Sequence, residues 1–122
     1  MIAGIYNMLI EQGTTFVRAF TLQYPDLEED PSGETYVDYD LTGYTARMQI
    51  RRTIDSTSIM LTCTTENGRI SIEDGTITLT IPANVTSTLT SSGVYDIEII
   101  DGSGIVSRVV QGTMTLSPEV TR

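Results

Sequence analysis

Hydrophobic and polar residues alternate along most of this chain, and clusters of turn-forming residues separate the alternating runs. The clearest run covers 76–81, where three threonines interleave with Ile77, Leu79 and Ile81. A second run covers 44–51 and a third covers 95–99. Because successive side chains of a β-strand point to opposite faces, these runs predict strands with one buried face and one exposed face.

Further strands are predicted from shorter or less regular runs. These runs cover residues 5–10, 14–22, 58–64, 69–72 and 105–116. Turns separate the later ones at Asn67-Gly68, 73–75 and 101–104, because Gly, Asn and Asp tolerate positive φ angles. About seven to nine short strands with turns at short intervals predict an all-β sandwich or a small barrel.

Two local features modify this pattern. The segment Pro82–Ser91 predicts one short helical turn near 83–90, since Val85 and Leu89 would lie one turn apart on its inner side. The run 105–116 contains Gly112, where the missing side chain would permit a β-bulge. We therefore expect the last strand to bend at Gly112.

The shared phase of the alternating runs predicts the hydrophobic core. A slip of one residue would turn every side chain of a strand to the other face, so each strand has one defined buried set. Cys63 lies in an alternating run and is expected to fill space as a small apolar residue. The predicted core residues are Phe16, Phe20, Tyr44, Met48, Ile50, Ile77, Leu79, Ile81, Leu89, Tyr95, Ile97 and Ile99.

The composition agrees with one stable domain over residues 1–122. A chain of 122 residues has room for one core, and folding removes about two-thirds of the extended chain's surface from water. Hydrophobic residues make up 39% of the chain and charged residues 19%, which excludes a disordered tail. The single cysteine excludes an intrachain disulfide, so the fold needs no oxidising compartment.

The charge is strongly negative, with 16 acidic residues against 7 arginines and a net charge of −9. The resulting negative electrostatic field would repel nucleic acid and an anionic membrane surface, which argues against both as partners. No apolar run reaches the ~20 residues of a membrane-spanning helix. The first ten residues lack the basic region of a signal peptide. We therefore expect a protein that is made and kept in a cytoplasm.

The segment at about 24–40 departs from the alternating pattern. It contains seven of the acidic residues and a predicted turn at 31–34, which together predict a long exposed loop or hairpin. Tyrosine is a frequent interface anchor, so we expect docking on a partner through residues 24–44 and the chain ends, with Tyr44 mostly in the core. The candidate partner-binding residues are Tyr24, Tyr36, Tyr39, Asp26, Glu28, Glu29 and Asp30.

This sequence contains few of the residue types that enzymes use for catalysis. Without histidine or lysine, the usual general base is absent, and neither Cys63 nor any serine has an activating base. The acidic segment and Asp101 offer oxygen ligands for calcium, but their spacing differs from an Asp-x-Asp-x-Asp-Gly loop. We expect a solvated acidic segment, no catalytic activity, no cofactor and no metal requirement for folding.

The arginines on and beside the predicted strands have two possible uses. Those at 47, 51, 52, 69 and 108 could bind acidic groups of a partner, because guanidinium matches the geometry of a carboxylate; solvation of a strand face is the commoner use. Arg51 and Arg52 also lie near Asp55, where a surface ion pair would contribute at most ~1 kcal/mol.

Several segments together resemble a known family. The segments are Gly13-Thr14-Thr15-Phe16, the run from Asp40 to Arg51 that reads DLTGYTARMQIR, and Tyr95-Asp96-Ile97-Glu98. They resemble a widespread set of small structural proteins of tailed bacteriophages. They are also similar to the immunoglobulin-like N-terminal domain of siphophage upper baseplate proteins. The resemblance spans nearly the whole chain and contains no catalytic motif.

The resemblance implies an immunoglobulin-like antiparallel β-sandwich and a non-enzymatic structural role in a tailed-phage virion. The implied location is the tail or baseplate, where the chain would be an adaptor present in multiple copies in a symmetric assembly and bound to other virion proteins. In the baseplate family further segments follow this domain, whereas this chain stops at Arg122. A capsid decoration protein is therefore the alternative, and a cellular binding module of sandwich fold is the second.

Overall fold

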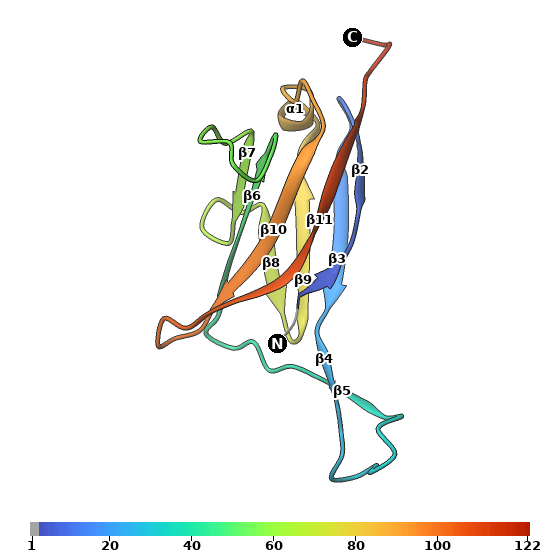
Figure 1. Ribbon diagram of the computed structural model, residues 1–122, viewed down its shortest axis with the longest axis vertical. Coiled ribbons are helices and arrows are strands. Elements are labelled where there is room, and N and C mark those ends of the chain that lie inside the picture. The colour runs from blue at the N-terminus through green and yellow to red at the C-terminus, as the bar shows by residue number, and fades with distance from the viewer. Residues whose placement is uncertain (1–2) are drawn as a thin grey trace.

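Two β-sheets pack face to face in the computed structural model, which describes residues 3–122 (Figure 1). The large sheet contains β1 (Gly4–Ile5), β2 (Met8–Glu11), β6 (Thr45–Arg51), β7 (Leu61–Thr64), β10 (Gly93–Ile100) and β11 (Val106–Ser117). The small sheet contains β3 (Phe16–Thr21), β8 (Ile70–Glu73) and β9 (Thr76–Ile81). A separate hairpin contains β4 (Gln23–Pro25) and β5 (Tyr36–Asp38), and the helix of the described residues is α1 (Ala83–Thr86).

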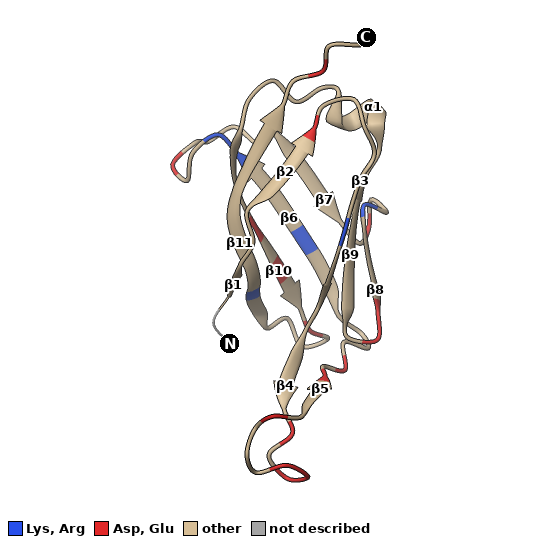
Figure 2. Cartoon of the chain, turned by 90° about the vertical axis from the view of Figure 1, so that its right-hand side faces the viewer, with Lys and Arg blue, Asp and Glu red and all other residues tan. Residues whose placement is uncertain are grey.

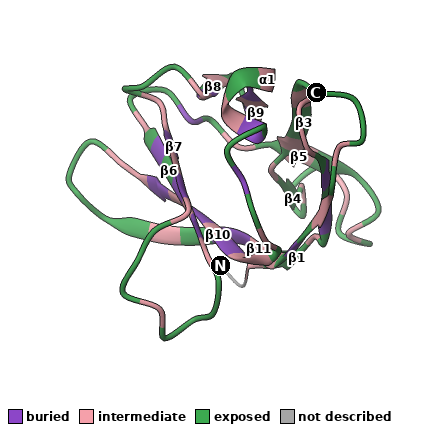
Figure 3. Ribbon diagram, turned by 90° about the horizontal axis from the view of Figure 1, so that it is seen from above, coloured by how far each residue is buried: buried purple, intermediate pink, exposed green. Residues whose placement is uncertain are grey.

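The connectivity confirms the predicted all-β sandwich with one short helical turn. The large sheet has the order β1-β11-β10-β6-β7, with β2 continuing β1 along β11, and the small sheet has the order β3-β9-β8. The chain therefore passes twice from the large sheet to the small sheet and back. Seen from above, β6, β7, β10 and β11 form one layer, and β3, β8 and β9 form the other (Figure 3). Neighbouring strands are antiparallel, with the exception that β1 and β2 run parallel to β11. Among residues 3–122, nine strands lie in the two packed sheets and two in the hairpin.

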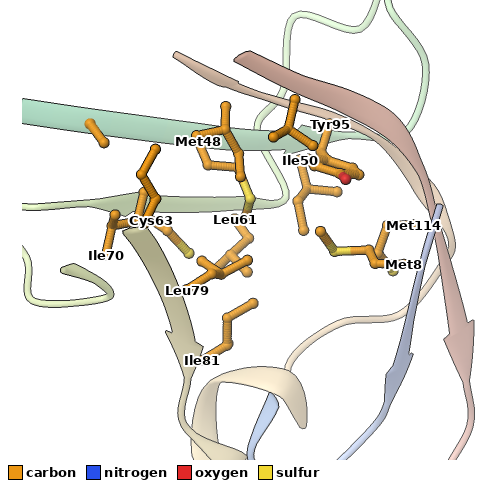
Figure 4. Close-up of a cluster of buried hydrophobic side chains, with 14 of the residues drawn as sticks. Met8, Met48, Ile50, Leu61, Cys63, Ile70, Leu79, Ile81, Tyr95 and Met114 are labelled. Atoms are coloured by element: carbon orange, nitrogen blue, oxygen red, sulfur yellow. The ribbon is translucent and has the colours of Figure 1, made fainter. Parts of the chain in front are cut away.

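The alternating strands place their apolar residues between the two sheets, as Figure 4 shows for part of the core. Ile97 of β10 is fully buried and lies opposite Met48 of β6 and Val110 of β11. Its sequence neighbours Asp96 and Glu98 point to the outer face of the large sheet and are half-buried. Full burial of one such aliphatic side chain stabilises the fold by about 1.5–3 kcal/mol.

Nine of the twelve predicted core residues are buried, and the prediction was wrong for Phe16, Phe20 and Tyr44. These three are half-buried and pack against the core from its margin. Both phenylalanines lie on β3, an edge strand of the small sheet, and Tyr44 lies in the turn before β6. Further buried residues come mostly from short or irregular elements, and they are Met8, Ile10, Leu41, Ala46, Leu61, Cys63, Ile70, Val109, Val110 and Met114.

The β-bulge of β11 does not lie at Gly112, where the sequence would permit one. The register between β10 and β11 shifts between Ile97 and Glu98, which leaves Val109 of β11 as the extra residue of a bulge. Val109 and Val110 are consequently both buried. Beyond the bulge, the side chains of β11 therefore alternate between the core and the outer face in the opposite phase.

The helical turn α1 is tied to the turn between β2 and β3. Thr86 is fully buried, and its hydroxyl donates to the carbonyl of Thr14 at 2.7 Å and accepts from the backbone N–H of Gly13 at 3.0 Å. Gln12 donates its side-chain amide to the carbonyl of Leu89 at 2.8 Å. Residues 12–14 therefore bind the start of the chain to the connection before β10. No helix in the described part of the chain is long and apolar enough to span a membrane.

Candidate functional site

The acidic segment forms a β-hairpin that projects beyond one end of the sandwich (Figures 1 and 2). In this hairpin arm, residues 23–38, Tyr24 pairs with Val37 and Pro25 pairs with Tyr36. The backbone N–H of Asp26 continues the ladder by donating to the carbonyl of Thr35 at 2.8 Å. The sequence left open whether the segment is a loop or a hairpin, and the structure shows the hairpin.

Aspartate side chains order the tip of the arm. The carboxylate of Asp30 accepts hydrogen bonds from the hydroxyl of Thr35 at 2.8 Å and from the backbone N–H of Ser32 at 3.2 Å. Hydrogen bonds from the Ser32 and Thr35 side chains lower the pKa of this carboxyl below its usual range. The tip turn runs from Asp30 to Gly33, whose N–H donates to the Asp30 carbonyl, so it begins one residue before the predicted turn at 31–34.

The remaining charge of the arm is available to a partner. The arm contains six acidic residues and no arginine. Within residues 3–122, neither of the two salt bridges of the protein involves the arm. Glu28 and Glu29 are exposed at the tip. Groups of three or more His, Cys, Asp or Glu side chains able to hold a metal ion are absent among the described residues.

The arm also exposes apolar side chains beside its carboxylates. Tyr24 is 42% exposed, Tyr36 is 57% exposed, and Leu27, which the sequence reasoning did not select, is 59% exposed. Tyr24 and Tyr36 lie on opposite faces of the two-stranded ribbon, because Tyr24 pairs with the neighbour of Tyr36. Exposed aromatic and aliphatic side chains with an acidic surround are typical of a protein-binding element.

The other predicted binding residues do not all join this surface. Tyr39 is half-buried, contacts the core, and meets the ring of Tyr24 edge to face at 5.0 Å between centroids. It therefore supports the base of the arm. Tyr44 also packs against the core. The C-terminus lies at the end of the sandwich opposite the arm (Figure 1), so the structure does not bring the arm and this chain end together. Residues 1 and 2 of the other chain end lie outside the described residues.

Comparison of the sequence with models of protein families and with curated proteins gives no match. The assignment of a function therefore rests on the residues and on the geometry of this chain.

Proposed function

We propose that this protein is a non-enzymatic structural component of a tailed-phage virion, made in the host cytoplasm, that docks on other virion proteins through its hairpin arm. Tail or baseplate is the proposed location. The observation that carries the proposal is the arm itself, which holds exposed apolar side chains, and carboxylates that form no salt bridge within residues 3–122, away from the sandwich. The fold does not require these exposed groups, whereas a binding surface does.

The phage-like segments support this proposal through their positions in the fold. The run from Asp40 to Arg51 forms a turn and the central strand β6, and Tyr95 to Glu98 lie in the adjacent strand β10. Gly13 to Thr15 lie in the turn that is bound to α1, and Phe16 begins β3. These segments specify a rigid scaffold, and a rigid scaffold can present a binding element without any catalytic residue.

A variant that lacks the outer part of the arm, called the arm-less variant, tests the proposal; it keeps Tyr24 and Tyr36 at the base of the arm. Residues 26–35 are replaced by Asn-Gly, because Pro25 and Tyr36 are paired and a two-residue turn can join them. The variant is produced in place of the normal protein in the phage that encodes it. We expect unchanged thermal unfolding of the isolated domain and loss of the protein from purified particles, measured by mass spectrometry. Normal incorporation of a folded arm-less variant would disprove docking through the arm.

Charge variants test whether docking depends on the carboxylates of the arm or only on its shape. Glu28→Gln with Glu29→Gln removes two charges from the arm, and Glu11→Gln with Glu66→Gln removes two exposed charges elsewhere. We expect reduced incorporation for the first pair and normal incorporation for the second. Antibody labelling of particles in electron micrographs then distinguishes a tail position from decoration of the head.

A further inference from the structure

The outer face of the large sheet carries three of the seven arginines. We define the arginine face as Arg47, Gln49, Arg51, Asp96, Glu98, Arg108 and Gln111, which come from β6, β10 and β11. The face contains a hollow of about 420 Å³, and Ile54, in the connection between β6 and β7, contributes to its wall. Blue segments on β6 and β11 in Figure 2 mark part of it.

Within residues 3–122, two of these arginines have carboxylate partners and the third does not. Arg47 pairs with Glu98 at 2.9 Å, and Arg108 pairs with Asp96 at 3.3 Å. Arg51 instead donates to the carbonyl of Ser56 at 2.8 Å and to the side-chain oxygen of Gln49 at 2.9 Å. The predicted ion pair with Asp55 is therefore wrong for Arg51 in the described residues. Three arginines against two carboxylates give the face a net positive charge, in a chain that is otherwise strongly acidic.

Exposed apolar residues border the same face. Ile5 and Leu9 pair in register with Gln111 and Thr115 of β11, so their side chains share the outer side of the large sheet. Ile5 is 76% exposed and Leu9 is 54% exposed, while Ile54 in the wall of the hollow is 86% exposed. The face thus combines cations with an apolar margin, whereas the arm combines carboxylates with exposed Tyr24, Leu27 and Tyr36.

One copy cannot join these two surfaces. The arm projects past the end of both sheets, and the arginine face lies along the side of the sandwich (Figure 2). The protein accordingly exposes 7488 Å², whereas a folded monomer of its mass of 13.4 kDa ordinarily exposes about 6,500 Å². The projecting arm exposes apolar and acidic side chains that a second molecule can cover.

We propose that the hairpin arm of one copy docks on the arginine face of a second copy. The carboxylates at the arm tip meet Arg51 and its neighbours, and the apolar side chains of the arm meet Ile54, Ile5 and Leu9. Two copies can exchange arms reciprocally in a two-fold dimer, or successive copies can dock arm to face and produce a closed ring or an open filament. The inference uses the arm assigned above as the docking element and identifies its partner as another copy of the same chain.

Two variants, each of which retains only one of the two contact surfaces, test this contact in purified protein. The arm-less variant retains the face, and Arg51→Glu retains the arm. Wild-type protein is expected to self-associate in a concentration-dependent manner at low salt and less at high salt, as measured by sedimentation velocity. Each variant alone is expected to be monomeric, and their mixture is expected to form a dimer with one copy of each, because only one arm and one face remain competent.

Controls separate the contact from loss of fold or of charge. Arg122→Glu makes the same charge change at the C-terminus, away from the face, and is expected to associate as the wild type does. Ile54→Asp changes an exposed side chain that the fold does not need, and is expected to weaken association about tenfold or more. Circular dichroism verifies that each variant is folded.

Several results would overturn the contact. Wild-type protein that stays monomeric at about 0.5 mM and low salt would do so, since this range detects even weak assembly. Undiminished self-association of the arm-less variant, or no mixed dimer from the two variants, would do so as well. Arm-dependent incorporation into particles together with a monomeric purified protein would reject this contact and leave the proposed function intact.

Discussion

Gly112 of β11 lies directly against the carbonyl oxygen of Tyr6, and a Cβ atom at position 112 would overlap that oxygen. The strands β1 and β2 pair with β11 on either side of this point, so the backbone there cannot move away without breaking the ladder. The same carbonyl accepts a hydrogen bond from the hydroxyl of Tyr95, which is buried. Close approach of the first strand to β11 therefore depends on the absence of a side chain at Gly112.

Gly112→Ala is expected to lower the free energy of unfolding by about 2 kcal/mol, because the added methyl group meets backbone and not a flexible side chain. Urea unfolding followed by circular dichroism measures the change. Gly102→Ala is the matched control, since a Cβ there has no atom within 4 Å and should change stability by less than about 0.5 kcal/mol. Equal stability of the two variants would contradict the close approach.

Ile97→Asp is expected to unfold the isolated domain. Ile97 is fully buried between Met48 and Val110, and an unpaired carboxylate at that position costs several kcal/mol. Val17→Asp places the same charge on the outward side of β3, where the side chain is 60% exposed, and should remain folded. Thermal unfolding followed by circular dichroism compares the two. A cooperative Ile97→Asp variant with the wild-type Tm would show that the assigned strand phase is wrong.

Asp101→Asn is expected to destabilise the protein at neutral pH and not at acidic pH. The Asp101 carboxylate accepts hydrogen bonds from the backbone N–H of Ile105 at 2.9 Å and from Ser103, which lower its pKa. A carboxyl with a lowered pKa in the folded state stabilises above the pKa of the unfolded chain, and this contribution disappears as the pH falls through the folded pKa. Urea midpoints of both proteins from pH 7 to below pH 3.8, the ordinary value of Asp, measure the effect. A difference that stays constant over this range would exclude the ionised carboxylate as its source.

Cys63 is expected to react with a thiol reagent only through unfolding. The side chain is fully buried, and burial raises the pKa of the thiol to about 11, with partial opposition from the nearby Arg69. At pH 8 the labelling rate should follow the population of unfolded protein across a urea titration. Rapid labelling without urea would instead demonstrate local opening of β7, the edge strand that carries Cys63.

The sequence by itself determined the central strands and the exposure of the acidic segment. β6, β9 and β10 were predicted because each has one face on the core and one face outside it. Hydrophobic and polar residues therefore alternate along the sequence of each strand. The hairpin was predicted as an exposed segment because its charge and prolines cannot be buried. Both conclusions depend on local chemistry, which a single sequence contains.

The tertiary structure decided those features that depend on contacts between residues distant in the sequence. Phe16 and Phe20 have the right phase for a core, but β3 is an edge strand, so burial stays incomplete. Arg18 shares their phase, and only the approach of β1 and β2 explains its position over the ring of Tyr6, 4.5 Å from the centroid. The bulge at Val109 follows from pairing with β10. The arginine face unites residues more than fifty positions apart because strand order, and not sequence order, sets which side chains meet across a sheet.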